Sequence, residues 1–307
     1  MESASRRAFF TGRRASSASV WGQFSQRLRR VVAGAFHDDG EYNGFGRGRL
    51  LVSGPADVRH ARDLCAEHGV VLVLDGVDYP SFPVGQSILR VDPAPAMAQC
   101  QPMPDAPDLW FVQPGCTVGE LQQAGLPQFA DFPSYLSVAA CIADRTLMNW
   151  PTGQTWRSGL SMASVVLADG SAGVLGAFGP ENRQPLATMT LQTLIPGLFR
   201  LAADVAAVDC LQSAYWPGRY RLDALSPQSG RTVNLSHLLL GHGGDLAWVD
   251  WMVFHSVPDP ITPPVLQGWG QAAGSEADLW YAAQGLDLQV KGMFDPCGIF
   301  PHPGQEL

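Results

Sequence analysis

One glycine-rich loop of the chain carries both a base and an acid that could take part in catalysis. The segment Gly241-His242-Gly243-Gly244-Asp245 holds an imidazole and a carboxylate three residues apart, and glycine permits the sharp turns that would bring them together. Histidine titrates near neutral pH, so it is the side chain most often used for general acid–base catalysis. The same pattern is typical of a surface turn with a solvated histidine, and the residues alone favour that interpretation.

Patterns for metal-assisted or nucleophilic chemistry are missing from the sequence. His237 and His242 are five residues apart, so they do not share the helical face that a metal-binding pair needs. The sequence has neither a G-x-S-x-G elbow nor a Walker A loop. The cysteines form no C-x-x-C pair, which argues against zinc and iron–sulfur sites. Their even number permits disulfides, but their wide spacing favours reduced thiols in the cytoplasm. They are Cys65, Cys100, Cys116, Cys141, Cys210 and Cys297.

An alternation of strands and helices must position these residues. Val70–Leu74 is an uninterrupted apolar run, as expected for a strand buried on both faces. Pro55 can begin a helix before it, and Thr117 can cap another one. Further strands are predicted at 50–52, 88–91, 109–113, 164–170 and 247–255, a helix at 201–208, and a strand or helix end at 235–240.

Residues 291–307 combine a helix end with a proline-locked tail. Pro296 biases Asp295 away from helical geometry, and Gly298 permits a sharp reversal. Ile299 and Phe300 then offer an apolar anchor. We therefore expect an ordered tail rather than a frayed one.

The tail and two inner motifs resemble the FAD-linked oxidases of the vanillyl-alcohol oxidase/p-cresol methylhydroxylase (PCMH) type. These proteins end in Lys-x-x-(hydrophobic)-Asp-Pro-x-Gly, which residues 291–298 match. Val112–Leu121 resembles their strand that ends in Pro-Gly before a helix, and Val165–Gly170 resembles their later strand that ends in Ala-Asp-Gly. The three motifs occur in the family's order, and the Asp-Pro-Cys-Gly form is most similar to the FAD-binding subunit of glycolate oxidase.

The resemblance implies an α+β fold. It implies a two-subdomain PCMH-type FAD-binding domain, followed by a shortened α+β cap domain and the closing tail. We divide the chain accordingly into an Arg-rich N-terminal segment and linker at 1–48, an FAD-binding-like domain at 49–200, and a reduced substrate or cap domain at 201–307. The linker prediction rests on the glycines of residues 40–48.

FAD is the cofactor that the resemblance implies, held mainly by the backbone of small residues. Two segments depart from the family pattern, because Asp75 and Asp78 bring negative charge toward a diphosphate, and Ala139 and Ala140 stand where the family has Gly-Gly. At about 4–6 Å each such charge pair would cost about 3–4 kcal/mol at an effective dielectric near 20. The residues that the resemblance assigns to the cofactor are Gly76, Val77, Ser81, Pro114, Gly115, Ser137, Val138, Ala139, Ala140, Gly153, Gly159 and Gly197.

The activity that the resemblance implies is that of an FAD-linked oxidoreductase subunit. Such a subunit would oxidise a small 2-hydroxy acid by hydride transfer to the flavin, with other oxidase subunits as partners. The altered cofactor segments leave a second hypothesis of another class, a non-catalytic family member that acts as a scaffold or partner subunit. An unrelated α/β protein is a third hypothesis. No catalytic residue is assigned.

Charge is spread unevenly along the chain. The formal net charge is -8, yet seven of the 20 basic residues lie in residues 1–35 beside a single acid, Glu2. The rest is strongly acidic, which argues against a nucleic-acid-binding surface on the body. No run approaches eighteen apolar residues, so we expect no transmembrane segment.

The Arg-rich N-terminal segment leaves several interpretations open. Ser5–Phe10 resembles a twin-arginine export signal, but the apolar region that should follow is missing. The composition also fits a mitochondrial-type presequence, which implies organellar import if the source is eukaryotic. Residues 19–36 predict an amphipathic helix that either contacts an acidic partner or anionic lipid, or docks by its apolar stripe. We expect a cytoplasmic protein, with peripheral membrane contact as the alternative.

Overall fold

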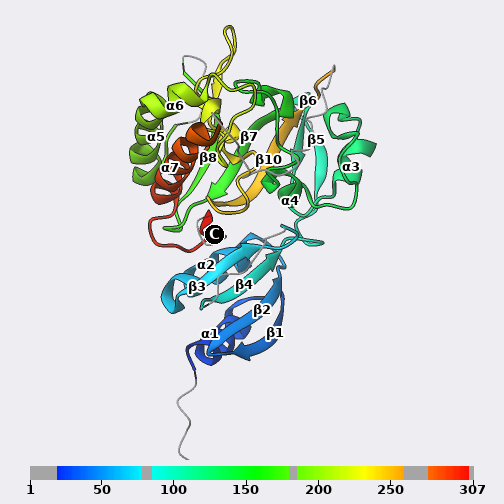
Figure 1. Ribbon diagram of the computed structural model, residues 1–307. Coiled ribbons are helices and arrows are strands. Elements are labelled where there is room, and N and C mark those ends of the chain that lie inside the picture. The colour runs from blue at the N-terminus through cyan, green and yellow to red at the C-terminus, as the bar shows by residue number, and fades with distance from the viewer. Residues whose placement is uncertain (1–18, 78–84, 180–184, 259–275, 304–307) are drawn as a thin grey trace, which may run out of the picture.

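The computed structural model describes residues 19–77, 85–179, 185–258 and 276–303, which form two sheets with helices packed against them (Figure 1). This arrangement confirms the predicted α+β class. Twin-arginine-like residues 5–10 and the candidate Ser81 lie outside the described residues. None of the helices within the described ranges has the length and hydropathy that crossing a bilayer requires.

The first sheet belongs to the N-terminal part of the chain. Its strand order is β1-β2-β4-β3, in which β1 pairs antiparallel with β2 while β2 and β3 flank β4 in parallel. Every residue of β3 is buried, as its apolar run predicts. The strands are β1 (Ala35–Tyr42), β2 (Phe45–Leu51), β3 (Val70–Leu74) and β4 (Ser87–Asp92), and the helices are α1 (Val20–Val31) and α2 (Pro55–His68).

Residues 40–48 are not a linker, and that prediction was wrong. They lie in the β1–β2 hairpin, whose turn residues Asn43 and Gly44 have φ values of 53° and 83°. Positive φ at both central residues is the requirement of a type I′ turn, for which Asn-Gly is the preferred pair. The amphipathic helix before the hairpin is docked by its apolar stripe, because Trp21, Phe24 and Leu28 of α1 are buried.

The second sheet, which we call the body sheet, is antiparallel with strand order β5-β6-β10-β7-β8-β9. Strand β10 comes late in the chain yet lies between β6 and β7, so the predicted boundary at residue 200 runs through this sheet. The strands are β5 (Cys100–Met103), β6 (Ala106–Val112), β7 (Leu160–Val166), β8 (Ala172–Phe178), β9 (Val233–Asn234) and β10 (Trp248–His255).

Helices lie on both sides of the body sheet. In Figure 1, α3 and α4 stand beside β5 and β6, whereas α5, α6 and α7 form a group next to β8. The α-helices are α3 (Val118–Gln123), α4 (Val138–Ala143), α5 (Met189–Ala202), α6 (Val205–Cys210) and α7 (Glu276–Phe294), and the 3₁₀ helices are η1 (Pro127–Phe129), η2 (Thr155–Ser158), η3 (Leu222–Leu225) and η4 (Leu235–Leu239).

The helix predicted at 201–208 is two helices. Helix α5 ends at Ala202, and Asp204 caps α6 by accepting a hydrogen bond from the backbone of Ala206 at 3.0 Å. An aspartate at this position satisfies a free helical N–H, which favours a new helix start over continuation. Residues 235–240, left open between strand and helix end, form η4.

Candidate functional site

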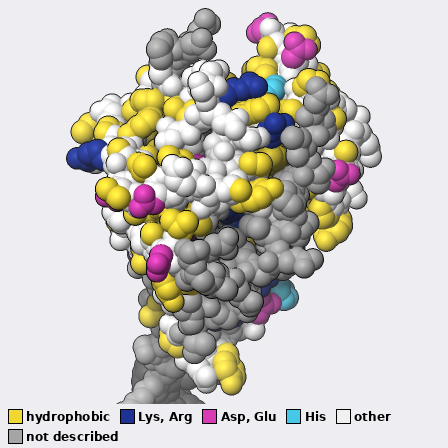
Figure 2. Space-filling view, turned by 45° about the horizontal axis from the view of Figure 1, so that its top comes forward, with side chains coloured by type: hydrophobic (Ala, Val, Ile, Leu, Met, Phe, Trp, Pro, Cys, Tyr) yellow, Lys and Arg dark blue, Asp and Glu magenta, His cyan; other side chains and the backbone are white. Residues whose placement is uncertain are grey.

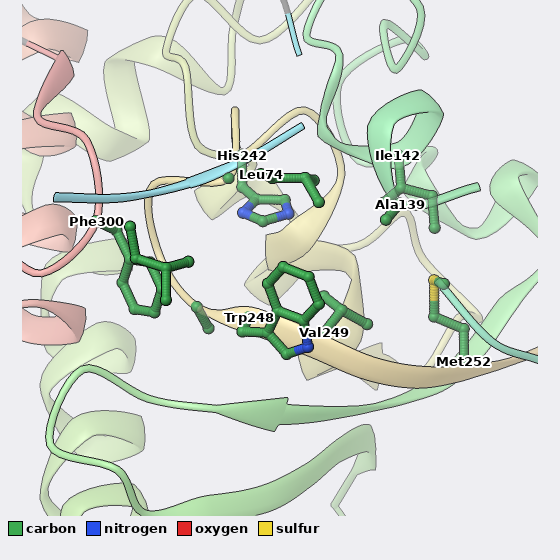
Figure 3. A pocket seen from close by; sticks show the side chains of 11 residues that line it. Leu74, Ala139, Ile142, His242, Trp248, Val249, Met252 and Phe300 are labelled. Carbon is green, nitrogen blue, oxygen red and sulfur yellow. The ribbon is translucent and has the colours of Figure 1, made fainter. Parts of the chain in front are cut away.

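The two sheets meet along an apolar seam that gathers segments far apart in the sequence. Strand β3 supplies one side, and α4, the start of β10 and the tail supply the other (Figure 3). In Figure 3 the Trp248 and His242 rings and the Phe300 side chain face the same space. The seam is lined by Leu72, Leu74, Ala139, Ile142, His242, Gly244, Ala247, Trp248, Val249, Met252 and Phe300.

Three of the segments assigned to the cofactor come together at this seam. A Cβ atom placed on Gly76, after β3, would lie 3.3 Å from the Cβ of Ala140 in α4. The backbone N–H of Ala139 donates to the carbonyl of Pro114 at 3.1 Å. The loop after β3, the Pro114-Gly115 step and the start of α4 therefore form one contiguous surface.

Backbone amides on this surface are used within the chain. Gly115 donates to the Met97 carbonyl at 2.7 Å, and Val138 donates to the Cys116 carbonyl at 2.7 Å. The Ser137 hydroxyl caps α4 by accepting from the Ala140 N–H at 3.2 Å. These N–H groups hold the segments in place, so they are not free to bind a diphosphate.

Three other candidate glycines lie in separate parts of the body. Gly153 donates to the Asp223 carboxylate at 2.8 Å and has a φ of 73°. Gly159 ends η2 with a φ of 71°, a left-handed conformation that glycine adopts at low cost. Gly197, which the resemblance puts at a glycine site, lies inside α5. A Cβ atom added to it would lie 3.3 Å from the Met293 sulfur.

Asp75 is less of an obstacle to an anion than its sequence position suggests. Its carboxylate pairs with the Arg49 guanidinium at 2.8 Å and lies 3.7 Å from that of Arg90. Two cations therefore offset its charge. Val77, two residues further, packs against the N-terminal core, whereas Asp78 lies outside the described residues.

The seam is closed. The space at its centre that a water molecule can occupy is about 10 Å³, room for roughly one water. Binding pockets for small molecules and cofactors have volumes of about 300–1,000 Å³. Trp248 and Phe300 fill the space and are 4% and 2% exposed. As arranged, the described residues of the seam do not accommodate FAD.

The glycine-rich loop with His242 and Asp245 is buried, so its interpretation as a solvated turn was wrong. Gly241 and Gly243 donate to the carbonyls of Ile142 and Ala143 at 2.7 and 2.8 Å, which fixes the loop to the end of α4. Burial, with the charges of Arg219 and Lys291, lowers the pKa of His242 to about 3. The imidazole is therefore neutral at physiological pH, and its Nδ1 has no hydrogen-bond partner among the described residues.

Asp245 is held in an ionic arrangement next to the seam. Its carboxylate accepts from Arg219 Nε at 2.6 Å and from the Tyr220 hydroxyl at 3.3 Å. Burial raises the pKa of Asp245, and the Arg219 charge acts against that shift. The Asp245 carboxylate thus has its own partners, and the structure shows no side-chain hydrogen bond that joins it to His242 as an acid–base pair.

The tail motif fastens the body to the N-terminal sheet. Lys291 Nζ in α7 donates to the Asp245 carbonyl at 2.7 Å, to the Asp295 carboxylate at 2.5 Å and to the Phe300 carbonyl at 3.2 Å. The Asp295 carboxylate also accepts from the backbone of Ile299 and Phe300 at 2.9 and 2.8 Å. Leu72 of β3 donates to the Ile299 carbonyl at 2.8 Å. The predicted order of the tail is confirmed for residues up to 303.

No protein-family model and no curated protein matches the chain. Solved structures with a similar fold include 4-ethylphenol oxidase from Gulosibacter chungangensis, with 12% identity and a TM-score of 0.46 over 80% of this chain and 44% of that one. A second is glucooligosaccharide oxidase from Acremonium strictum, described with a cysteinyl, histidyl FAD, with 16% identity and a TM-score of 0.40 over 76% of this chain and 42% of that one. A third is 6-hydroxy-D-nicotine oxidase from Arthrobacter nicotinovorans, with 11% identity and a TM-score of 0.40 over 73% of this chain and 42% of that one. All three are oxidases. The chain spans less than half the length of each.

The residues that close the seam were not identified from sequence. Trp248 belongs to a strand that the aromatic pattern predicts, and Phe300 belongs to the predicted apolar anchor. Neither pattern indicates that the two side chains share one space, because 52 positions separate them in the sequence.

Proposed function

We propose that the chain is a subunit of an FAD-linked oxidoreductase. The observation that carries the proposal is the meeting of three segments at the seam: the loop at Gly76, the Pro114-Gly115 step and the start of α4. The resemblance to the vanillyl-alcohol oxidase type assigns these same segments to FAD. The role of the tail supports the proposal, because the motif that carries the resemblance is the one that completes the seam.

The finer assignments rest on the tail's similarity to the FAD-binding subunit of glycolate oxidase. They are a small 2-hydroxy acid as substrate and other oxidase subunits as partners. The six cysteines, which are all unpaired, support a reducing compartment such as the cytoplasm. FAD would require the seam to widen at Trp248 and Phe300.

The closed seam favours a second candidate function, a non-catalytic scaffold or partner subunit. The water-sized space of about 10 Å³ and the internally bonded amides of Gly115 and Val138 support it. Core packing and site chemistry are separable, so a fold can persist after its ligand is lost. In this role the chain would serve another subunit through its surface.

Titration of the purified full chain with FAD decides between the two candidates. Equilibrium dialysis and the visible absorbance of the protein fraction give the stoichiometry. One FAD per folded chain supports the oxidoreductase subunit and rejects the scaffold. Folded protein that takes up no FAD, alone and after co-expression with flavin supplementation, rejects the oxidoreductase assignment for this chain and supports the scaffold.

A further inference from the structure

A cationic group lies at the end of the body sheet remote from the seam. The start of β7 and the end of β10 are adjacent there, since Leu160 pairs with Phe254. At about 3.3 Å per residue, this end of β10 is about 20 Å from Trp248. Figure 2 shows basic side chains, in dark blue, near a histidine, in cyan, toward the top of the view. We call the group Trp156, Arg157, Ser161, Arg231 and His255 the Trp156 cluster.

Two guanidinium groups share one indole in the Trp156 cluster. The Cζ atoms of Arg231 and Arg157 lie 3.8 and 4.6 Å from the centroid of the Trp156 ring. Stacking on an aromatic face attracts each guanidinium. Arg157 is also oriented by its Nε, which donates to the Gln154 side chain at 2.7 Å. The two guanidinium groups thus have the same indole as their stacking partner.

No carboxylate compensates these charges among the described residues, where Arg157 and Arg231 form no ion pair. Elsewhere, half of the arginines of the described residues that form ion pairs, such as Arg49 and Arg221, have an aspartate within 2.8 Å. An uncompensated guanidinium pair favours an oxyanion, which accepts charge-assisted hydrogen bonds from both groups.

A hydroxyl and an imidazole extend the donor set. The Ser161 hydroxyl and His255 Nδ1 are 3.0 Å apart, and both residues are partly exposed. Burial and then the charge of Arg231 lower the pKa of His255. Gln128 Nε2 donates to the His255 carbonyl at 2.7 Å and fixes the end of β10.

We propose that the Trp156 cluster is a binding site for a small oxyanion, held by the guanidinium groups of Arg157 and Arg231. Phosphoryl and carboxylate groups both present two or more acceptor oxygens in a geometry that matches the N–H donors of a guanidinium group. The site does not depend on the proposed function, because it lies at the other end of β10 from the seam.

Calorimetric titration of the full chain with inorganic phosphate, and separately with malonate, tests the site and distinguishes the two sources. We expect saturable binding of at least one anion with a dissociation constant at or below about 1 mM. Arg231→Gln should weaken it about tenfold or more, because the exposed guanidinium is lost while the fold is retained. Arg157→Gln is a second variant with the same expected result.

Arg200→Gln is the matched control, since Arg200 is an exposed arginine of α5 outside the Trp156 cluster. It removes the same charge and changes only the long-range electrostatic field of the protein. The affinity for the anion should therefore stay within about twofold of the wild-type value. The proposal is overturned if neither anion saturates the chain, or if the control weakens binding as much as Arg231→Gln.

Discussion

Lys291, the single lysine of the chain, is held by three oxygen acceptors and is 1% exposed. Burial lowers its pKa, and the Asp295 charge acts in the opposite direction. A buried cation of this kind is stable because its hydrogen bonds and its counter-charge replace water. Its side chain joins α7, the Asp245 loop and the tail at one point.

Replacing Lys291 with methionine should destabilise the protein by about 3–5 kcal/mol, because the Asp295 carboxylate would remain buried without its cation. Urea unfolding followed by circular dichroism measures the change. Arg30→Met at the exposed end of α1 is the control and should change stability by less than about 0.5 kcal/mol. A loss below about 1 kcal/mol for the Lys291 variant would show that water reaches Asp295.

His242 should make stability depend on pH. Its pKa is about 3 in the folded protein and near 6.5 in an unfolded chain. The unfolded state therefore binds more protons between these values, and stability falls as pH drops below about 6.5. His242→Asn should make this slope shallower by up to about 1.4 kcal/mol per pH unit. Unfolding free energies of the wild type and the variant, measured from pH 7 to pH 4, test this, and equal slopes for the two proteins would contradict it.

At the level of elements, the Pro114-Gly115 step shows why a glycine can be required without a ligand. A Cβ atom on Gly115 would lie 2.7 Å from the Pro93 carbonyl oxygen and 2.8 Å from that of Met97. Both contacts are to backbone, which cannot move aside as a side chain does. The glycine therefore permits the close approach of the segment before β5 to the end of β6.

Gly115→Ala should cost about 1–3 kcal/mol through this overpacking. Gly54→Ala is the matched control, because an added Cβ there meets nothing within 4 Å and its φ of 166° is extended backbone. Thermal unfolding of the two variants provides the comparison. Equal melting temperatures would mean that the backbone around residues 93–97 relaxes without cost.

Local patterns predicted most elements, but pairing and site geometry depended on contacts distant in sequence. The strands at 70–74, 88–91 and 247–255 were predictable because apolar runs and alternation are local signals. The central place of β10 was not, since it arises from pairing with β6 more than a hundred residues earlier. Likewise, the sequence could not distinguish Gly153 and Gly197 from glycines that bind a cofactor, because a tight turn or a close packing contact also requires glycine.

At the scale of the whole molecule, Phe300 and the tail hold the two sheets together. Phe300→Ala should destabilise the chain by about 3–5 kcal/mol and loosen the seam first. Hydrogen exchange at the Leu72 amide, which donates to Ile299, should accelerate more than exchange in the body sheet. Such a selective increase indicates opening at the seam rather than global unfolding.

Phe254→Ala is the control for this experiment, because Phe254 is equally buried but packs on Phe129 at the other end of β10. It should cost similar stability without singling out Leu72. If both variants accelerate Leu72 and the body sheet to the same extent, the tail does not act as a separate fastening.

The late position of the tail and of β10 also sets the order in which the chain can assemble during synthesis. β6 and β7 leave the ribosome before the strand that lies between them, and β3 leaves long before Ile299. Domains generally fold as units as they emerge, and long-range pairings form slowly. In the nascent protein, β6 and β7 therefore lack the strand that lies between them until residues 248–255 have been synthesised, and their facing edges expose unpaired backbone groups in that interval.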